Sequence, residues 1–140
     1  MRHEVLTAAL QIAMKAHAGQ VDRAGKPYIL HPLTVASMTA TGDEFVAALL
    51  HDVLEDSSYT MGDLEAAGIP DHILEALALL THDTDEPYMA YVERIKSNPL
   101  ARAVKLADLK HNSDLSRLPV VTERDRYRAE KYKKAMDLLA

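Results

Sequence analysis

The feature that most constrains the fold is the division of the chain into short segments with helical apolar periodicity, separated by prolines, glycines and capping residues. Residues 4–18 form an amphipathic segment that is followed by Gly19, a residue that favours a helix end. Pro87 and Pro99 each stand where a further helix is expected to begin. No convincing alternating strand pattern is present. The sequence therefore predicts a compact all-α protein of about seven or eight helices, forming a single domain over residues 1–140.

Capping residues predict three further helix starts. Asp43 is expected to cap a continuous helix over residues 43–56, DEFVAALLHDVLED. Thr60 and Thr122 are each followed three residues later by an aspartate, a pattern that resembles a capping box.

Prolines suggest the limits of two other helices. Pro32 suits the first turn of a helix that runs to about Thr41. The helix that begins at Pro99 is expected to continue until Pro119 ends it.

Composition excludes several classes of function. The chain has no cysteine, which rules out disulfides, thiolate zinc sites and cysteine nucleophiles. No apolar run approaches the length of a membrane span, so a cytoplasmic protein without a membrane partner is expected. The formal net charge of −5 argues against broad nucleic-acid binding but allows a locally basic pocket for a phosphorylated small molecule. The oligomeric state stays open.

Paired acids and histidines in apolar surroundings indicate a metal site. His51 and Asp52 lie inside the apolar run FVAALLHDVLED, and burying them costs several kcal/mol unless they are paired or ligate a metal. On a helix, Glu55 would stack on His51, and Asp56 on Asp52. Asp108 faces a similar desolvation problem in the middle of the segment AVKLADLKHN.

Each of these signals also has a purely structural interpretation. The His51-Asp52 pair and the acids after it are compatible with a solvated cluster near a helix end. Lys105, three residues before Asp108, offers that carboxylate a salt bridge. His31 alone is typical of a cap or surface residue. The combination, in this order along the chain, is far more specific than any part.

The ordered motifs resemble the HD-domain superfamily of metal phosphohydrolases. Within it they resemble the hydrolase domain of the RelA/SpoT-type alarmone enzymes and their small single-domain relatives. The matching segments are residues 16–20 (AHAGQ), 25–32 (GKPYILHP), 50–56 (LHDVLED) and 104–108 (VKLAD), followed by His111 and Asn112.

The resemblance implies an HD fold, a divalent metal and a hydrolytic mechanism. The family's metal is usually Mn²⁺, and two imidazoles with two carboxylates also suit Fe²⁺ or Zn²⁺. Glu55 and Asp56 match the acidic pair that positions or activates the attacking water, without indicating which of them is the base. The residues that match the family's metal ligands are His31, His51, Asp52 and Asp108.

For the substrate, the resemblance implies ppGpp, which would lose its 3′-pyrophosphate to give GDP and pyrophosphate. Two departures leave the nucleotide open: Asp22 stands where alarmone hydrolases carry a basic residue, and Leu109-Lys110 replaces the family's Arg-Leu. An HD-type phosphohydrolase of another nucleotide, or a metal- or nucleotide-binding module with little turnover, are therefore alternatives. The candidate substrate-binding residues are Arg23, Lys26, Tyr28, Lys105 and Asn112.

Overall fold

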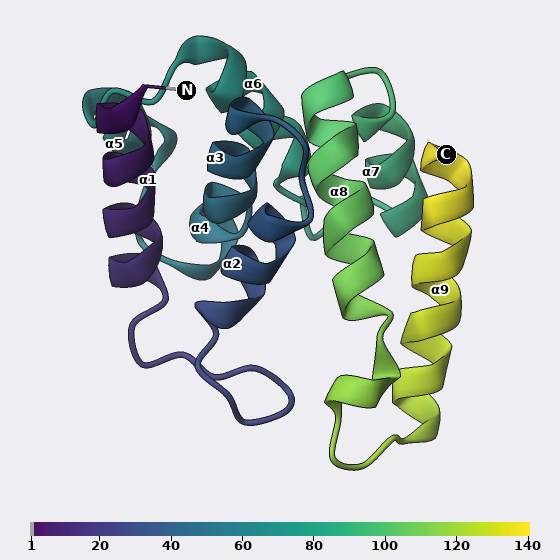
Figure 1. The fold of residues 1–140 in the computed structure, drawn as a ribbon. Helices are drawn as coiled ribbons and strands as arrows, with labels where there is room; N and C mark the ends of the chain where they lie inside the picture. The colour runs from purple at the N-terminus through teal and green to yellow at the C-terminus, as the bar shows by residue number, and fades with distance from the viewer. Residues whose placement is uncertain (1) are drawn as a thin grey trace.

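The computed structural model describes residues 2–140, and α-helices follow one another along this part of the chain (Figure 1). They are α1 (His3–Ala16), α2 (Leu30–Ser37), α3 (Gly42–Leu50), α4 (Val53–Asp56), α5 (Met61–Ala66), α6 (Asp71–Leu80), α7 (Tyr88–Ile95), α8 (Pro99–Asn112) and α9 (Glu123–Leu139), with a 3₁₀ helix, η1 (Leu115–Arg117), before α9. Extended pairing within residues 2–140 is limited to one isolated bridge between Val21 and Pro27. The predicted all-α fold is confirmed.

The predicted capping boxes are present. At the start of α5 the Thr60 side chain accepts the amide of Asp63, and the Asp63 carboxylate accepts the amide of Thr60. Thr122 and Asp125 make the same two bonds at the start of α9. These reciprocal bonds satisfy backbone donors that a helix start leaves free, which is why the sequence alone located both helices.

Three predicted boundaries are wrong. The N-cap of α3 is Thr41 and not Asp43, because Thr41 Oγ1 accepts the Glu44 amide at 3.2 Å. The second helix has Pro32 in its first turn, as predicted, but it ends at Ser37 and not near Thr41. The helix from Pro99 ends at Asn112, well before Pro119, and the chain then forms the separate turn η1.

The predicted helix over residues 43–56 is broken at His51 and Asp52. The His51 amide bonds to the carbonyl of Ala48, three residues back, and residues 51–52 form a turn between α3 and α4. In a straight helix, adjacent side chains diverge by about 100°. At this turn the two side chains approach each other, with His51 Nε2 3.1 Å from Asp52 Oδ2.

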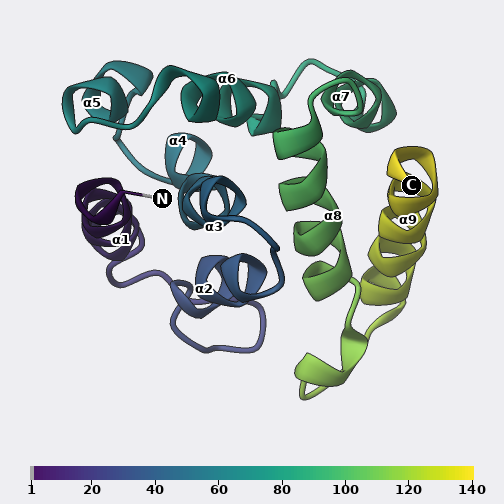
Figure 2. The ribbon, with the colours of Figure 1, turned by 45° about the horizontal axis from the view of Figure 1, so that its top comes forward.

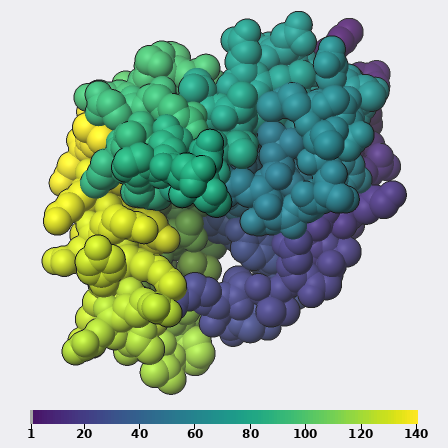
Figure 3. Space-filling model, turned by 180° about the vertical axis from the view of Figure 1, so that it is seen from behind, coloured from purple at the N-terminus to yellow at the C-terminus, as the bar shows by residue number. Residues whose placement is uncertain are grey.

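The core surrounds α3, whose residues Val46 to Leu50 are all buried. This helix packs against α1, α2, α6 and α8. Helix α8 runs between the α2–α3 pair and α9, so it joins the two sides of the molecule (Figure 2). Among the described helices, none is long and apolar enough to cross a membrane. Seen from behind, the surface is hollowed between α9, in yellow, and the purple segment that leads to α2 (Figure 3).

Candidate metal centre

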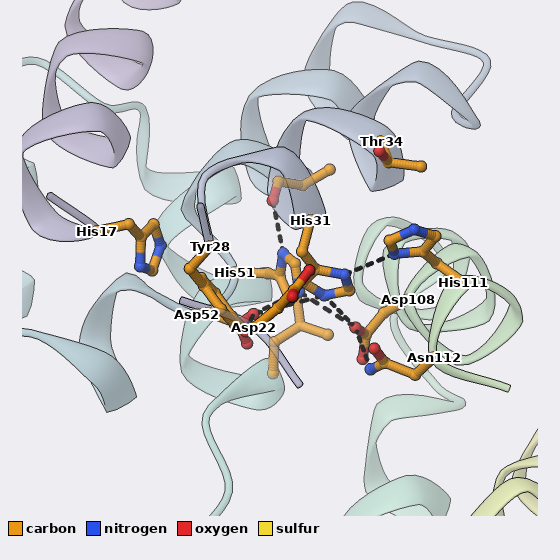
Figure 4. Close-up of polar contacts among 12 residues, drawn as sticks. His17, Asp22, Tyr28, His31, Thr34, His51, Asp52, Asp108, His111 and Asn112 are labelled. Atoms are coloured by element: carbon orange, nitrogen blue, oxygen red, sulfur yellow. Dashed lines mark hydrogen bonds and ion pairs between the residues drawn. The ribbon is translucent and has the colours of Figure 1, made fainter. Parts of the chain in front are cut away.

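Two histidines and two aspartates from three parts of the chain meet beside this hollow (Figure 4). His31 comes from α2, His51 and Asp52 from the turn after α3, and Asp108 from α8. His31 Nε2 lies 2.9 Å and His51 Nε2 lies 3.3 Å from Asp108 Oδ1. Asp52 Oδ2 lies 3.1 Å from His51 Nε2 and 3.6 Å from His31 Nε2.

The donor atoms suit a divalent cation. One ligand atom from each of His31, His51 and Asp108 lies within 4.8 Å of the other two, and all three residues are buried. His51 Nδ1 donates to the carbonyl of Ala48 at 2.6 Å, which leaves the lone pair on Nε2. That buried Nε2 has no hydrogen-bond partner among the described residues. A lone pair beside two carboxylates calls for a cation between them, so this cluster is a candidate divalent metal site.

The charges of the cluster favour the same conclusion. Burial alone would lower the pKa of His51, but the carboxylates of Asp52 and Asp108 outweigh it and raise that pKa well above 6.5. Burial raises the pKa of Asp52, yet His51 beside it holds the value at about 2. The two carboxylates thus favour the protonated, positively charged form of the buried His51 imidazole. A metal cation bound between these side chains would supply the same positive charge.

Asp108 is held by its own helix. Lys105 Nζ lies 2.9 Å from Asp108 Oδ2, and the Asn112 side-chain amide donates to Asp108 Oδ1 at 3.0 Å. The ammonium group of Lys105 is 5.1 Å from the centre of the Tyr91 ring. Lys105, an expected substrate contact, is therefore buried beneath the ligand, where its charge compensates Asp108.

Tyr28 supports the other carboxylate. Its hydroxyl donates to Asp52 Oδ2 at 2.6 Å, and burial followed by the charge of Asp52 raises the pKa of Tyr28. The sequence suggested Tyr28 as a substrate contact, and the structure places it against the candidate metal centre.

The sequence motifs assign no role to His111. It follows Asp108 by three residues on α8, and its Nδ1 lies 2.8 Å from His31 Nδ1. Burial, followed by the neighbouring Arg117 and His31, lowers the pKa of His111 to about 4. Its only sequence signal was its place directly before Asn112.

The acidic pair lies on α4, close in sequence to the centre but outside its contacts. Glu55 accepts a hydrogen bond from the backbone amide of His82. Partial burial, followed by the charges of Asp52 and Glu55, raises the pKa of Asp56 to about 6. Within residues 2–140 neither carboxylate makes a hydrogen bond or ion pair with the four central side chains.

A pocket of about 360 Å³ opens beside the centre. Tyr28, His31 and Asn112 line its inner end, whereas Arg128 and Tyr132 line it from α9. No local motif ties α9 to the site, because these contacts depend on how the helices pack.

The outer rim of the pocket is crossed by two ion pairs. Arg23 pairs with Asp125, and Arg117 Nη1 lies 4.0 Å from Asp22 Oδ2. Asp22 also accepts the amides of Ala24 and Lys26, so it orders its own loop. The Arg23 side chain is 51% exposed and already paired, and Lys26 is exposed and does not line the pocket.

The arrangement of the helices is similar to that of a protein of known structure. The chain matches the solved structure of a metazoan SpoT orthologue, described as hydrolysing ppGpp, with a TM-score of 0.80, 24% identity, and coverage of 99% of this chain and 86% of that one. At this identity the match establishes the fold, which is that of the HD-type hydrolase domain.

Relatives in sequence point the same way. The chain is 37% identical over 72% of its length to the guanosine-3′,5′-bis(diphosphate) 3′-pyrophosphohydrolase of Haemophilus influenzae. It is 33% identical over 77% of its length to a probable GTP pyrophosphokinase of Mycobacterium leprae, and 44% identical over 43% to the bifunctional (p)ppGpp synthase/hydrolase SpoT of Escherichia coli. The chain spans only 17%, 15% and 9% of these relatives. No protein-family model matches it. The resemblance to RelA/SpoT-type hydrolases is confirmed.

Proposed function

We propose that residues 1–140 act as a single metal-dependent phosphohydrolase domain that removes the 3′-pyrophosphate of ppGpp, giving GDP and pyrophosphate. The observation that carries the proposal is the buried group of His31, His51 and Asp108, with Asp52 beside it, at the inner end of a pocket. Relatives named for this reaction support the substrate. The cytoplasmic location expected from the sequence forms part of the proposal.

Our mechanism assigns each group a separate task. His31, His51, Asp52 and Asp108 hold the ion, and Mn²⁺ is our choice over Fe²⁺ or Zn²⁺. Held by these residues, a divalent ion would supply Lewis-acid chemistry, lowering the pKa of a water and polarising a phosphoryl oxygen. Glu55 or Asp56 orients the attacking water or accepts its proton. Tyr28 and Lys105 hold Asp52 and Asp108 in place through the bonds described above.

A hydrolase of another nucleotide is a second candidate, and the rim of the pocket favours it. Two of the three arginines that line the pocket, Arg23 and Arg117, face aspartates of the same rim. A substrate with two diphosphate groups would have to compete with those ion pairs. A nucleotide with fewer phosphates would leave them intact.

The test is pyrophosphate release from ppGpp by the purified Mn²⁺-loaded protein, measured beside a panel of nucleoside mono-, di- and triphosphates. We expect release from ppGpp that is lost on chelation. We also expect Glu55→Gln to remove turnover while Mn²⁺ remains bound. The matched control is His72→Ala, because His72 forms an exposed ion pair with Asp43.

Three outcomes would redirect the proposal. Cleavage of another nucleotide, with ppGpp left intact, would retain the metal chemistry and replace the substrate. Binding of Mn²⁺ without turnover of any nucleotide would favour a sensing module. Full activity in Glu55→Gln would assign the water-activating role to Asp56.

A further inference from the structure

We propose that His111 is a positioning residue that fixes the tautomer and orientation of His31 by accepting a hydrogen bond from His31 Nδ1. The inference rests on the proposed metal site and adds a residue to it. The two Nδ1 atoms are 2.8 Å apart, the ring centres are 5.0 Å apart, and the ring planes differ by 17°. The rings therefore lie nearly parallel, with one nitrogen facing the other (Figure 4).

The hydrogen-bond geometry determines which atom carries the proton. His31 Nε2 faces Asp108 Oδ1 at 2.9 Å and lies on the side of the candidate ion. A histidine that ligates through Nε2 is protonated at Nδ1 and must donate from there. Among the described residues, the acceptor within reach of His31 Nδ1 is His111 Nδ1. His111 must then carry its own proton on Nε2.

Helix α8 contacts both nitrogens of the His31 ring. Asp108 and His111 are three residues apart on α8, so they lie on one face of that helix. Asp108 contacts Nε2 of His31, whereas His111 contacts Nδ1. The ring orientation is thus set relative to α8, which also supplies Asp108, another residue that would hold the ion.

A neutral imidazole suits this position better than the carboxylate that often supports a ligating histidine. The centre already contains the carboxylates of Asp52 and Asp108, which Lys105 and His51 approach within 2.9 Å and 3.1 Å. A third carboxylate beside His31 would add a further negative charge to a buried group. An imidazole supplies the acceptor without adding charge.

The experiment is Mn²⁺ titration of the metal-free protein by calorimetry, with the thermal stability of each metal-free variant recorded in parallel. We expect His111→Phe, which keeps an aromatic ring but has no acceptor, to weaken Mn²⁺ binding by about 10- to 100-fold. His111→Asn, whose amide oxygen restores an acceptor near the Nδ1 position, should keep most of the wild-type affinity. His72→Phe is the matched control, because His72 is exposed and pairs with Asp43 outside the centre.

Measuring kcat at saturating Mn²⁺ distinguishes a residue that positions His31 from one that takes part in the reaction. Because His111 acts through His31, a saturating concentration of Mn²⁺ should restore the kcat of His111→Phe towards the wild-type value. Wild-type Mn²⁺ affinity in His111→Phe would overturn the inference, and so would equal losses in the Phe and Asn variants with unchanged stability. Failure of the wild-type protein to bind Mn²⁺ would overturn the proposed metal site together with this inference.

A spectroscopic measurement decides the matter even if His111→Phe does not fold. Long-range ¹⁵N–¹H correlation spectra of the wild-type protein loaded with diamagnetic Zn²⁺ report which ring nitrogen of each histidine carries a proton. We expect His111 to be protonated at Nε2 and unprotonated at Nδ1. A proton on His111 Nδ1 would set two donors against each other and exclude the bond.

Discussion

The candidate metal centre and the rim of the pocket lie side by side but are held in different ways. His31 and His51 are each 4% exposed, whereas the side chain of Arg23 on the rim is 51% exposed. Every central ligand also has a supporting contact from α8, Tyr28 or the backbone. The candidate centre is therefore more deeply buried and supported by more contacts than the Arg23 side of the rim, and we expect changes at the rim to leave ion binding unaffected.

Removing a central ligand tests this contrast most strongly. We expect Asp52→Ala to lower kcat/KM by more than about 100-fold, because the metal contributes several kcal/mol of transition-state stabilisation. Pyrophosphate release at a fixed Mn²⁺ concentration measures the loss, with His72→Ala as the control. A loss of less than tenfold would show that Asp52 is not needed to hold the ion.

Removing the ammonium group of Lys105 should lower the unfolding free energy of the protein. Lys105→Met leaves Asp108 buried without its ammonium partner, and breaking such a buried pair costs about 3–5 kcal/mol of unfolding free energy. Urea denaturation of the metal-free protein measures this change, with the exposed Lys134→Met as the control. The double variant Lys105→Met/Asp108→Asn should recover part of the loss, and no recovery would mean that the two groups are not coupled.

Local signals and long-range packing explain which of these features were predictable. The capping boxes at Thr60 and Thr122 act within one helical turn, so the sequence located α5 and α9. The break in the helix at His51 is not predicted from the sequence, because no proline or glycine lies next to it. The ligands were found through a motif resemblance, whereas the neighbours of Arg23 depend on how α9 packs against the rest of the chain.

Breaking the rim should have a much smaller effect on the protein. Arg23→Ala removes the ion pair with Asp125, and because the Arg23 side chain is half exposed, the unfolding free energy should fall much less than in Lys105→Met. Calorimetry should give an unchanged affinity for Mn²⁺. A loss of Mn²⁺ affinity similar to that in Asp52→Ala would contradict the separation between centre and rim.

The pH dependence of Asp125 gives the finest test of the rim. Hydrogen bonds from the backbone of Thr122, together with Arg23, lower the pKa of this carboxyl. Its stabilisation is therefore complete above the ordinary aspartate pKa of about 3.9 and is lost as the pH falls through the lower value of the folded state. The difference in unfolding free energy between the wild type and Asp125→Ala should narrow from pH 6 to pH 3. A constant difference would show that the ionised form is not responsible.

The separation of the central residues along the chain has a consequence during protein synthesis. His31 and Asp108 are 77 positions apart, and Lys105 belongs to the same late segment as Asp108. A nascent chain that has left the ribosome only as far as α7 carries His31, His51 and Asp52 but neither Asp108 nor Lys105. The four central side chains can therefore meet only after α8 has been synthesised and has docked against α2 and α3.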